Sequence, residues 1–272
     1  MKAALKEYIA NLAETTAAKE RYESELKIAR TIQMSFLPKN FPPFPENVEF
    51  DIYATLVSAK EVGGDLYDFF LLDEDHLFFS IGDVSGKGVP AALFMAAAKT
   101  LMKGTANREM TPAEVLSKVN HELCRENDSM MFVTVFCGIL NFRTGEMRYS
   151  NAGHNPPLVL RPGRPPEWLP LPDGFLLGVR EESVYETRQI LLAPGDMLLL
   201  YTDGVTEAMN SDRLFYEERR LIRVAEGHGQ ESPEGLVREV LRSVRDFADS
   251  EPQSDDITML ALSFRGRAEN PS

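Results

Sequence analysis

The first 37 residues contain neither glycine nor proline, and Ala, Glu, Lys and Leu dominate them. These residue types favour the α-helix. Pro38 follows at once, and further prolines stand at positions 42, 43 and 45. Proline lacks a backbone N–H and its ring blocks the preceding turn, so a helix cannot continue through this stretch. The sequence therefore predicts one helix over residues 1–37 and a separately folded part after it.

The predicted N-terminal helix is long for a helix of one domain. About 35 residues would extend about 50 Å, which is more than a domain of this size needs to cover its core. Positions 5, 9, 12, 16, 19, 23, 26 and 30 follow the alternating spacing of four and three residues that a coiled-coil seam requires. Only half of them are apolar, namely Leu5, Ile9, Leu12 and Leu26. Two interpretations follow: an amphipathic helix packed along its own domain, or a coiled coil between two copies. We favour the coiled coil and predict a homodimer through residues 1–37.

The composition excludes several classes of protein. The chain holds 29 basic and 42 acidic residues, a net charge of -13, and such a surface repels the phosphate backbone of nucleic acids. The longest mostly apolar run, residues 130–140, is too short to span a bilayer, and the N-terminus lacks the pattern of a secretory signal. Cys124 and Cys137 lie in apolar surroundings, which fits a reducing compartment. We predict a soluble cytoplasmic protein without a membrane span.

After the prolines, short apolar runs alternate with longer periodic ones. Strands are predicted at residues 48–57, 66–72, 77–81, 132–140, 147–151, 158–160, 188–191, 197–201 and 257–264. Helices are predicted at residues 90–102, 112–126, 216–225 and 233–248. Thr111 and Glu114 form a capping-box pattern before the second of these helices, and Ser232 is the predicted N-cap of the last. Strand runs interrupted by helix pairs predict an α+β fold with layered, antiparallel sheets.

Aspartates stand at or beside the ends of four predicted strands: Asp65, Asp83, Asp203 and Asp255. Carboxylates that converge at one edge of a fold repel one another unless cations neutralise them. Oxygen ligands suit Mg²⁺ or Mn²⁺, whereas the four histidines show no zinc-ligand spacing. A pair of such cations could activate water and clamp a phosphoryl group. Asp-Gly, as at position 203, is also an ordinary turn dipeptide, so spacing alone leaves the metal site open.

The segments EVGGDLYDF, GDVSGKGVPAALFMA, NAGHNPP, YTDGVTEA and SDDITML occur in this order. From about residue 28 to 264 the chain resembles the SpoIIE/RsbU branch of the bacterial PPM-type serine/threonine phosphatases, relatives of protein phosphatase 2C. The resemblance implies an α-β-β-α sandwich of two mainly antiparallel sheets flanked by helix pairs. Residues 38–266 would form this phosphatase domain, and residues 267–272 a tail.

The resemblance also implies an activity and a set of ligands. The family uses two Mn²⁺ or Mg²⁺ ions and a metal-bridging hydroxide to hydrolyse phosphoserine or phosphothreonine, usually in anti-anti-sigma (STAS-type) proteins. By motif position, Asp83 would bridge both ions and the Val84 backbone carbonyl would help to hold the second. Asp203 and Asp255 would bind the first ion, and Asp65 would support the second, directly or through water.

Three further positions differ from the family pattern or extend it. Asp256 is a further candidate ligand, at a place where many relatives carry asparagine. Lys60 stands where the eukaryotic branch has a phosphate-binding arginine, so it is either a phosphate contact or an ordinary solvated lysine. Ser85 stands where that branch has a histidine thought to protonate the leaving group, and a hydroxyl is too weak an acid for this task. A metal-bound water or another acid would have to replace it.

His154 lies in the NAGHNPP segment but is left out of the catalytic set, because a lone histidine at a strand–turn junction is more often structural. All four strand-end aspartates are present, which favours an enzyme over a catalytically silent, dimeric binding or signalling module on the same fold. In the family, N-terminal helices often connect the phosphatase to an upstream sensor or receiver domain. We predict that residues 1–37 transmit a regulatory state to the helices at 90–102 and 112–126.

Overall fold

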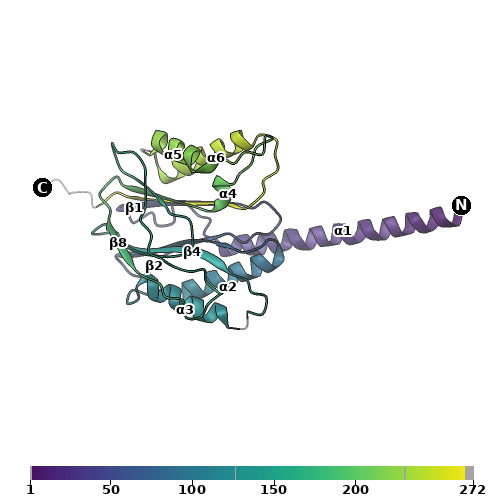
Figure 1. Ribbon diagram of the computed structural model, residues 1–272, viewed down its shortest axis with the longest axis horizontal. Helices are drawn as coiled ribbons and strands as arrows, with labels where there is room; N and C mark the ends of the chain where they lie inside the picture. Colours follow the sequence, from purple (N-terminus) through teal and green to yellow (C-terminus); the bar gives the residue numbers. More distant parts are fainter. Residues whose placement is uncertain (1, 126, 230, 267–272) are drawn as a thin grey trace.

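The computed structural model describes residues 2–125, 127–229 and 231–266. Two sheets of five strands face one another, helices cover both outer faces, and one long helix extends away from this body (Figure 1). All ladders between the named strands are antiparallel. The predicted α+β sandwich of antiparallel sheets is therefore confirmed, while the tail predicted at 267–272 lies outside the described residues.

The two sheets draw their strands from different parts of the chain. The first sheet has the order β1 (Phe50–Val57), β10 (Ile257–Phe264), β9 (Met197–Tyr201), β6 (Leu158–Leu160) and β7 (Glu167–Trp168). The second has the order β2 (Leu66–Leu71), β3 (His76–Val84), β4 (Val133–Asn141), β5 (Glu146–Ala152) and β8 (Arg188–Leu191). The helices after α1 (Lys2–Phe36) are α2 (Val89–Thr105), α3 (Pro112–Cys124), α4 (Asp203–Thr206), α5 (Glu217–His228) and α6 (Pro233–Ala248).

Three apolar layers hold this arrangement together. Phe79 and Leu262 belong to the layer between the two sheets. Met95 belongs to the layer under α2 and α3, on the outer face of the second sheet. Val240 belongs to the layer under α5 and α6, on the outer face of the first sheet. Most strands are therefore buried on both faces, and their apolar runs are nearly continuous instead of alternating.

Local signals in the sequence placed most elements correctly. The capping box of Thr111 and Glu114 is present at the start of α3, and the Ser232 side chain caps α6. The prediction missed β7 and α4. These elements have two and four residues, too few to show a periodic hydrophobic pattern.

Helix α1 stands away from the sandwich over most of its length (Figure 1). Its apolar side chains Ile9, Leu12 and Ile28 are all more than half exposed. Only the C-terminal end joins the body, where Met34 and Leu37 pack into the layer between the sheets. The interpretation that this helix packs along its own domain is therefore wrong, because its seam has too few apolar residues to bury. None of the helices in the described part of the chain has the length and apolar composition needed to cross a membrane.

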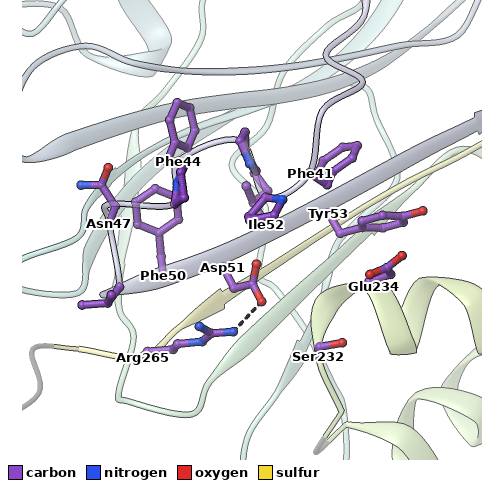
Figure 2. A pocket seen from close by; sticks show the side chains of 14 residues that line it. Phe41, Phe44, Asn47, Phe50, Asp51, Ile52, Tyr53, Ser232, Glu234 and Arg265 are labelled. Atoms are coloured by element: carbon purple, nitrogen blue, oxygen red, sulfur yellow. Dashed lines mark hydrogen bonds and ion pairs between the residues drawn. The ribbon is translucent and has the colours of Figure 1, made fainter.

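A pocket of about 390 Å³ lies where the proline-rich residues 41–48, strand β1 and the start of α6 meet (Figure 2). The ion pair of Asp51 and Arg265 forms part of its wall. This pocket is at the Phe50 end of β1, whereas Val57 at the other end pairs with Ile257, the neighbour of Asp256. The pocket is therefore remote from the strand-end aspartates.

Candidate metal centre

The four aspartate motifs meet at one end of the sandwich. Asp65 directly precedes β2. Asp83 is the second-to-last residue of β3 and pairs with Thr134 of β4. Since Leu66 pairs with Gly82, these two aspartates are neighbours across the second sheet. Asp203 follows β9 and Asp256 precedes β10, and these two strands pair with each other in the first sheet. The antiparallel register thus gathers residues that are far apart in the sequence.

Two glycines allow the motifs to approach closely. A Cβ atom on Gly64 would lie 2.7 Å from the Val84 carbonyl oxygen, and one on Gly204 would lie 1.9 Å from the Asp256 carbonyl oxygen. Any other residue would push the backbones apart. The first contact joins the Asp65 motif to the Asp83 motif, and the second joins the Asp203 motif to the Asp255–Asp256 motif.

The gathered carboxylates destabilise one another's charges. Burial, reinforced by the charge of Asp83, raises the pKa of Asp65 well above its usual range. Burial and the charge of Asp203 raise the pKa of Asp83 to about 7. Burial and the charge of Asp255 also raise the pKa of Asp203. A site of this kind holds its full negative charge only when positive charge is supplied.

Several of these carboxylates have a hydrogen-bonding or cationic partner from the chain itself. The Thr202 hydroxyl donates to Asp65 Oδ2 at 2.7 Å. Lys87 Nζ lies 2.8 Å from Asp255 Oδ2. Thr202 and Lys87 were not among the predicted site residues, although both lie inside the motifs. Thr202 precedes Asp203, and Lys87 stands between Gly86 and Gly88.

Asp256 holds the loop that leads to Asp65. Its buried side chain accepts hydrogen bonds from the Ala59 N–H at 2.9 Å and from the Gly64 N–H at 3.0 Å. Both carboxylate oxygens are thus engaged by the backbone. The structure gives Asp256 a positioning role, and its role as a metal ligand stays a prediction.

Lys60 lies on the exposed side of the same loop. Its carbonyl accepts a hydrogen bond from Arg30 Nη1 at 3.4 Å. Lys87, instead, places its basic side chain against the carboxylates. Partial burial lowers the pKa of Lys87, but pairing with Asp255 outweighs this and raises it. A phosphate contact by Lys60 stays a prediction.

Ser85 and His154 have structural partners. The Ser85 hydroxyl accepts a hydrogen bond from the Phe132 N–H at 3.0 Å. His154 is buried, and burial lowers its pKa to about 4, so the ring is neutral at pH 7. Its Nδ1 lies 2.9 Å from the Thr134 hydroxyl, which donates to the Asp83 carbonyl at 3.4 Å. His154 thus contacts the backbone of Asp83 through Thr134, and its omission from the catalytic set stays a prediction.

The donors at this site fit hard divalent cations. Among residues 2–125, 127–229 and 231–266, no three His, Cys, Asp or Glu side chains already surround a point suited to an ion. Thr202, Lys87 and a backbone amide are the present partners of Asp65, Asp255 and Asp256. The donors themselves are all oxygens, and their mutual repulsion is what Mg²⁺ or Mn²⁺ relieves. Asp65, Asp83, Asp203, Asp255 and the Val84 carbonyl are the residues that would hold such ions.

Comparison with known proteins decides the family. The model of the family "Stage II sporulation protein E (SpoIIE)" matches residues 73–265. The chain belongs to the SpoIIE family. It is 30% identical to the phosphoserine phosphatase RsbU of Bacillus subtilis, over 89% of this chain and 71% of RsbU. It is also 30% identical to protein IcfG of Synechocystis, over 94% of this chain but only 44% of IcfG. This SpoIIE-family chain thus spans less than half of one relative and about seven-tenths of the other.

The solved structures confirm the fold. The SiaA-PP2C domain of Pseudomonas aeruginosa superposes with a TM-score of 0.80 at 20% identity, over 91% of this chain and 99% of that domain. At this identity the likeness establishes the architecture alone. The SpoIIE-family chain therefore has the fold of the protein phosphatase 2C-like domains, as its motifs implied.

We expect divalent cations to stabilise this SpoIIE-family protein more at high pH than at low pH. Folding raises the pKa of Asp83 from 3.8 to about 7. The stability that this carboxyl contributes is therefore complete below pH 3.8 and is lost as the pH rises through about 7. Thermal unfolding in chelator should show a melting temperature that falls from about pH 5 to about pH 8.

Added Mn²⁺ should restore most of that loss, because it supplies the positive charge that the carboxylates need. The gain in melting temperature should thus be larger near pH 8 than near pH 5. Asp83→Asn, which removes the titrating group, is the matched control and should reduce the pH dependence. An equal gain from Mn²⁺ at both pH values would contradict this account of the site.

Proposed function

We propose that this SpoIIE-family chain is a metal-dependent phosphatase that hydrolyses phosphoserine or phosphothreonine in a protein of bacterial signalling. One observation carries the proposal: a complete set of mutually repelling carboxylates, Asp65, Asp83, Asp203 and Asp255, gathered at one end of a phosphatase fold. The similarity to RsbU, a phosphoserine phosphatase, supports the same activity.

The residues at this site would have different roles in the reaction. Two Mn²⁺ or Mg²⁺ ions, when bound, would activate a water for attack on phosphorus and neutralise the phosphoryl oxygens. Asp83 and Asp65 would hold that centre, and Thr202 orients Asp65 through its hydroxyl. Ser85 is engaged with the backbone of Phe132. That bond leaves the Ser85 O–H free, but a hydroxyl is too weak an acid at neutral pH, so the proton for the departing serine or threonine oxygen would come from another group.

The substrate that we propose is a phosphorylated anti-anti-sigma (STAS-type) protein. The resemblance of the five motifs to the SpoIIE/RsbU branch supports this choice. The test is phosphate release from a purified phosphorylated STAS-domain protein, compared with release from an unrelated phosphoserine protein at equal concentration. A clear preference for the STAS protein is the expected result, and equal rates on both proteins would contradict the assignment.

We further propose that α1 dimerises the protein and links it to an upstream sensor or receiver domain. The exposed apolar side chains Ile9, Leu12 and Ile28 support this, because a helix of this kind gains stability by burying them against a second copy. Removing residues 1–30, which include all three side chains, should therefore convert a dimer into a monomer, which light scattering measures. The full chain at the same concentration is the control. A truncated protein that remains dimeric would disprove dimerisation through α1.

A further inference from the structure

The last turn of α1 touches the candidate site through one side chain. Gln33 is only 6% exposed. Its Nε2 donates to the Gly63 carbonyl at 2.6 Å, and its Oε1 accepts from the Gly63 N–H at 3.2 Å. Both ends of the side-chain amide thus bind the backbone N–H and C=O of one residue, in the way that a neighbouring backbone would. Gly63 is two residues before Asp65.

Gly63 is held between two elements. On one side is Gln33, and on the other is Asp256, whose Oδ2 would lie 1.6 Å from a Cβ atom at position 63. The same oxygen accepts the Gly64 N–H at 3.0 Å. Because glycine alone fits at position 63, the loop before Asp65 has no room to shift on the Asp256 side. On the other side the loop is hydrogen-bonded to Gln33.

The end of α1 that carries Gln33 is fixed to the domain. Leu37 is buried between the sheets, and the Tyr67 hydroxyl donates to the Pro38 carbonyl at 2.7 Å. Most of the described side chains of α1 before Gln33 are exposed, and the helix is continuous from Lys2 to Phe36. Because the helix is unbroken, a rotation or shift of its exposed part would reach Gln33.

We propose that Gln33 is a positioning residue through which α1 sets the location of Asp65, and with it the affinity of the site for divalent cations. This inference rests on the proposed function, because it assigns Asp65 to the cation site. It gives α1 a direct route to the site, through the loop 59–64, that does not pass through α2 or α3.

The expected effect follows from what replacement of Gln33 leaves behind. Gln33→Leu keeps the size of the side chain but leaves the buried N–H and carbonyl of Gly63 without these partners. A buried polar group without a partner costs free energy. The loop should therefore shift away from α1 until water can bind the N–H and the carbonyl of Gly63. Residues that orient a ligand without touching the ion typically change metal affinity by about 10–100-fold when they are replaced.

The experiment compares wild-type protein, Gln33→Leu and the neighbouring Ile32→Ala, whose side chain is 54% exposed. Mn²⁺ affinity is measured by calorimetry, and hydrogen exchange is measured at the amides of Gly63 and Gly64. We expect Gln33→Leu to weaken Mn²⁺ binding by about 10–100-fold and to speed exchange at both amides. Excess Mn²⁺ should restore its turnover, which it would not do for a misfolded protein. Ile32→Ala should match the wild type in each measurement.

The proposal is overturned if Gln33→Leu binds Mn²⁺ as tightly as the wild type, or if exchange at Gly63 and Gly64 does not change. Gln33→Glu is the second variant, should Gln33→Leu fail to fold. It can still accept from the Gly63 N–H but cannot donate to the carbonyl, so it should show a smaller loss in the same direction. Hydrogen exchange needs neither metal nor substrate, so it tests the contact even if no phosphatase activity is found.

Discussion

Replacement of Lys99 by methionine is expected to lower the free energy of unfolding by about 3–5 kcal/mol. Lys99 on α2 places its Nζ 2.5 Å from Oδ2 of Asp68 on β2, and the two side chains are 7% and 2% exposed. Burying two charges costs free energy that only their close pairing offsets. Without Lys99, the charge of Asp68 would stay buried without its partner. Chemical unfolding followed by circular dichroism measures the loss.

The double variant Lys99→Met with Asp68→Asn tests the cause. It removes both charges, so it should recover a large part of the stability lost in the single variant. Lys19→Met is the control, because Lys19 pairs with Glu23 on the exposed surface of α1 and such pairs contribute about 0.5 kcal/mol or less. A single variant within about 1 kcal/mol of the wild type would show that the buried pair does not hold α2 on β2.

Asp83→Asn is expected to remove catalytic activity while leaving the protein folded and, at neutral pH in chelator, more stable. The loss of turnover should be on the order of 10³-fold or more, since losing a residue that only orients a ligand already costs about 10–100-fold. Stability should rise because the substitution removes one of the repelling charges that raise the pKa of Asp65. Steady-state phosphate release and thermal unfolding, measured on the same preparation, check both effects.

Asp83→Asn should lower the turnover but raise the stability, and this combination separates a role in catalysis from misfolding. A variant that lost activity by misfolding would lose stability as well. Asp212→Asn is the control, because Asp212 is exposed on the loop after α4 and should change neither quantity. If the Asp83→Asn variant is active, the assignment of Asp83 to the proposed metal centre is wrong.

Local signals were enough to predict most of the fold. Prolines ended α1 after Phe36, and the capping residues Thr111 and Ser232 marked the starts of α3 and α6. These signals act within a few residues of the element that they determine. The pattern of strands and helices also predicted layered antiparallel sheets, but the order of the strands within each sheet depends on contacts between distant residues and was not predicted.

The supporting residues of the site could not be predicted in this way. Thr202 and Gln33 have their partners 137 and 30 residues away in the chain. Only the tertiary fold shows that a threonine next to Asp203 binds Asp65, or that a glutamine in α1 binds Gly63. Asp256 likewise resembles a ligand in sequence, whereas the structure places both of its carboxylate oxygens on backbone amides.

The most direct test of the central claim is phosphate release from a phosphoserine protein and from a generic aryl phosphate, measured with Mn²⁺, with chelator, and with Asp83→Asn. The account predicts turnover that requires the metal and that both chelator and the substitution abolish. A folded protein that shows no turnover with any divalent metal would contradict it. The chain would then be a catalytically silent binding or signalling module on a phosphatase fold.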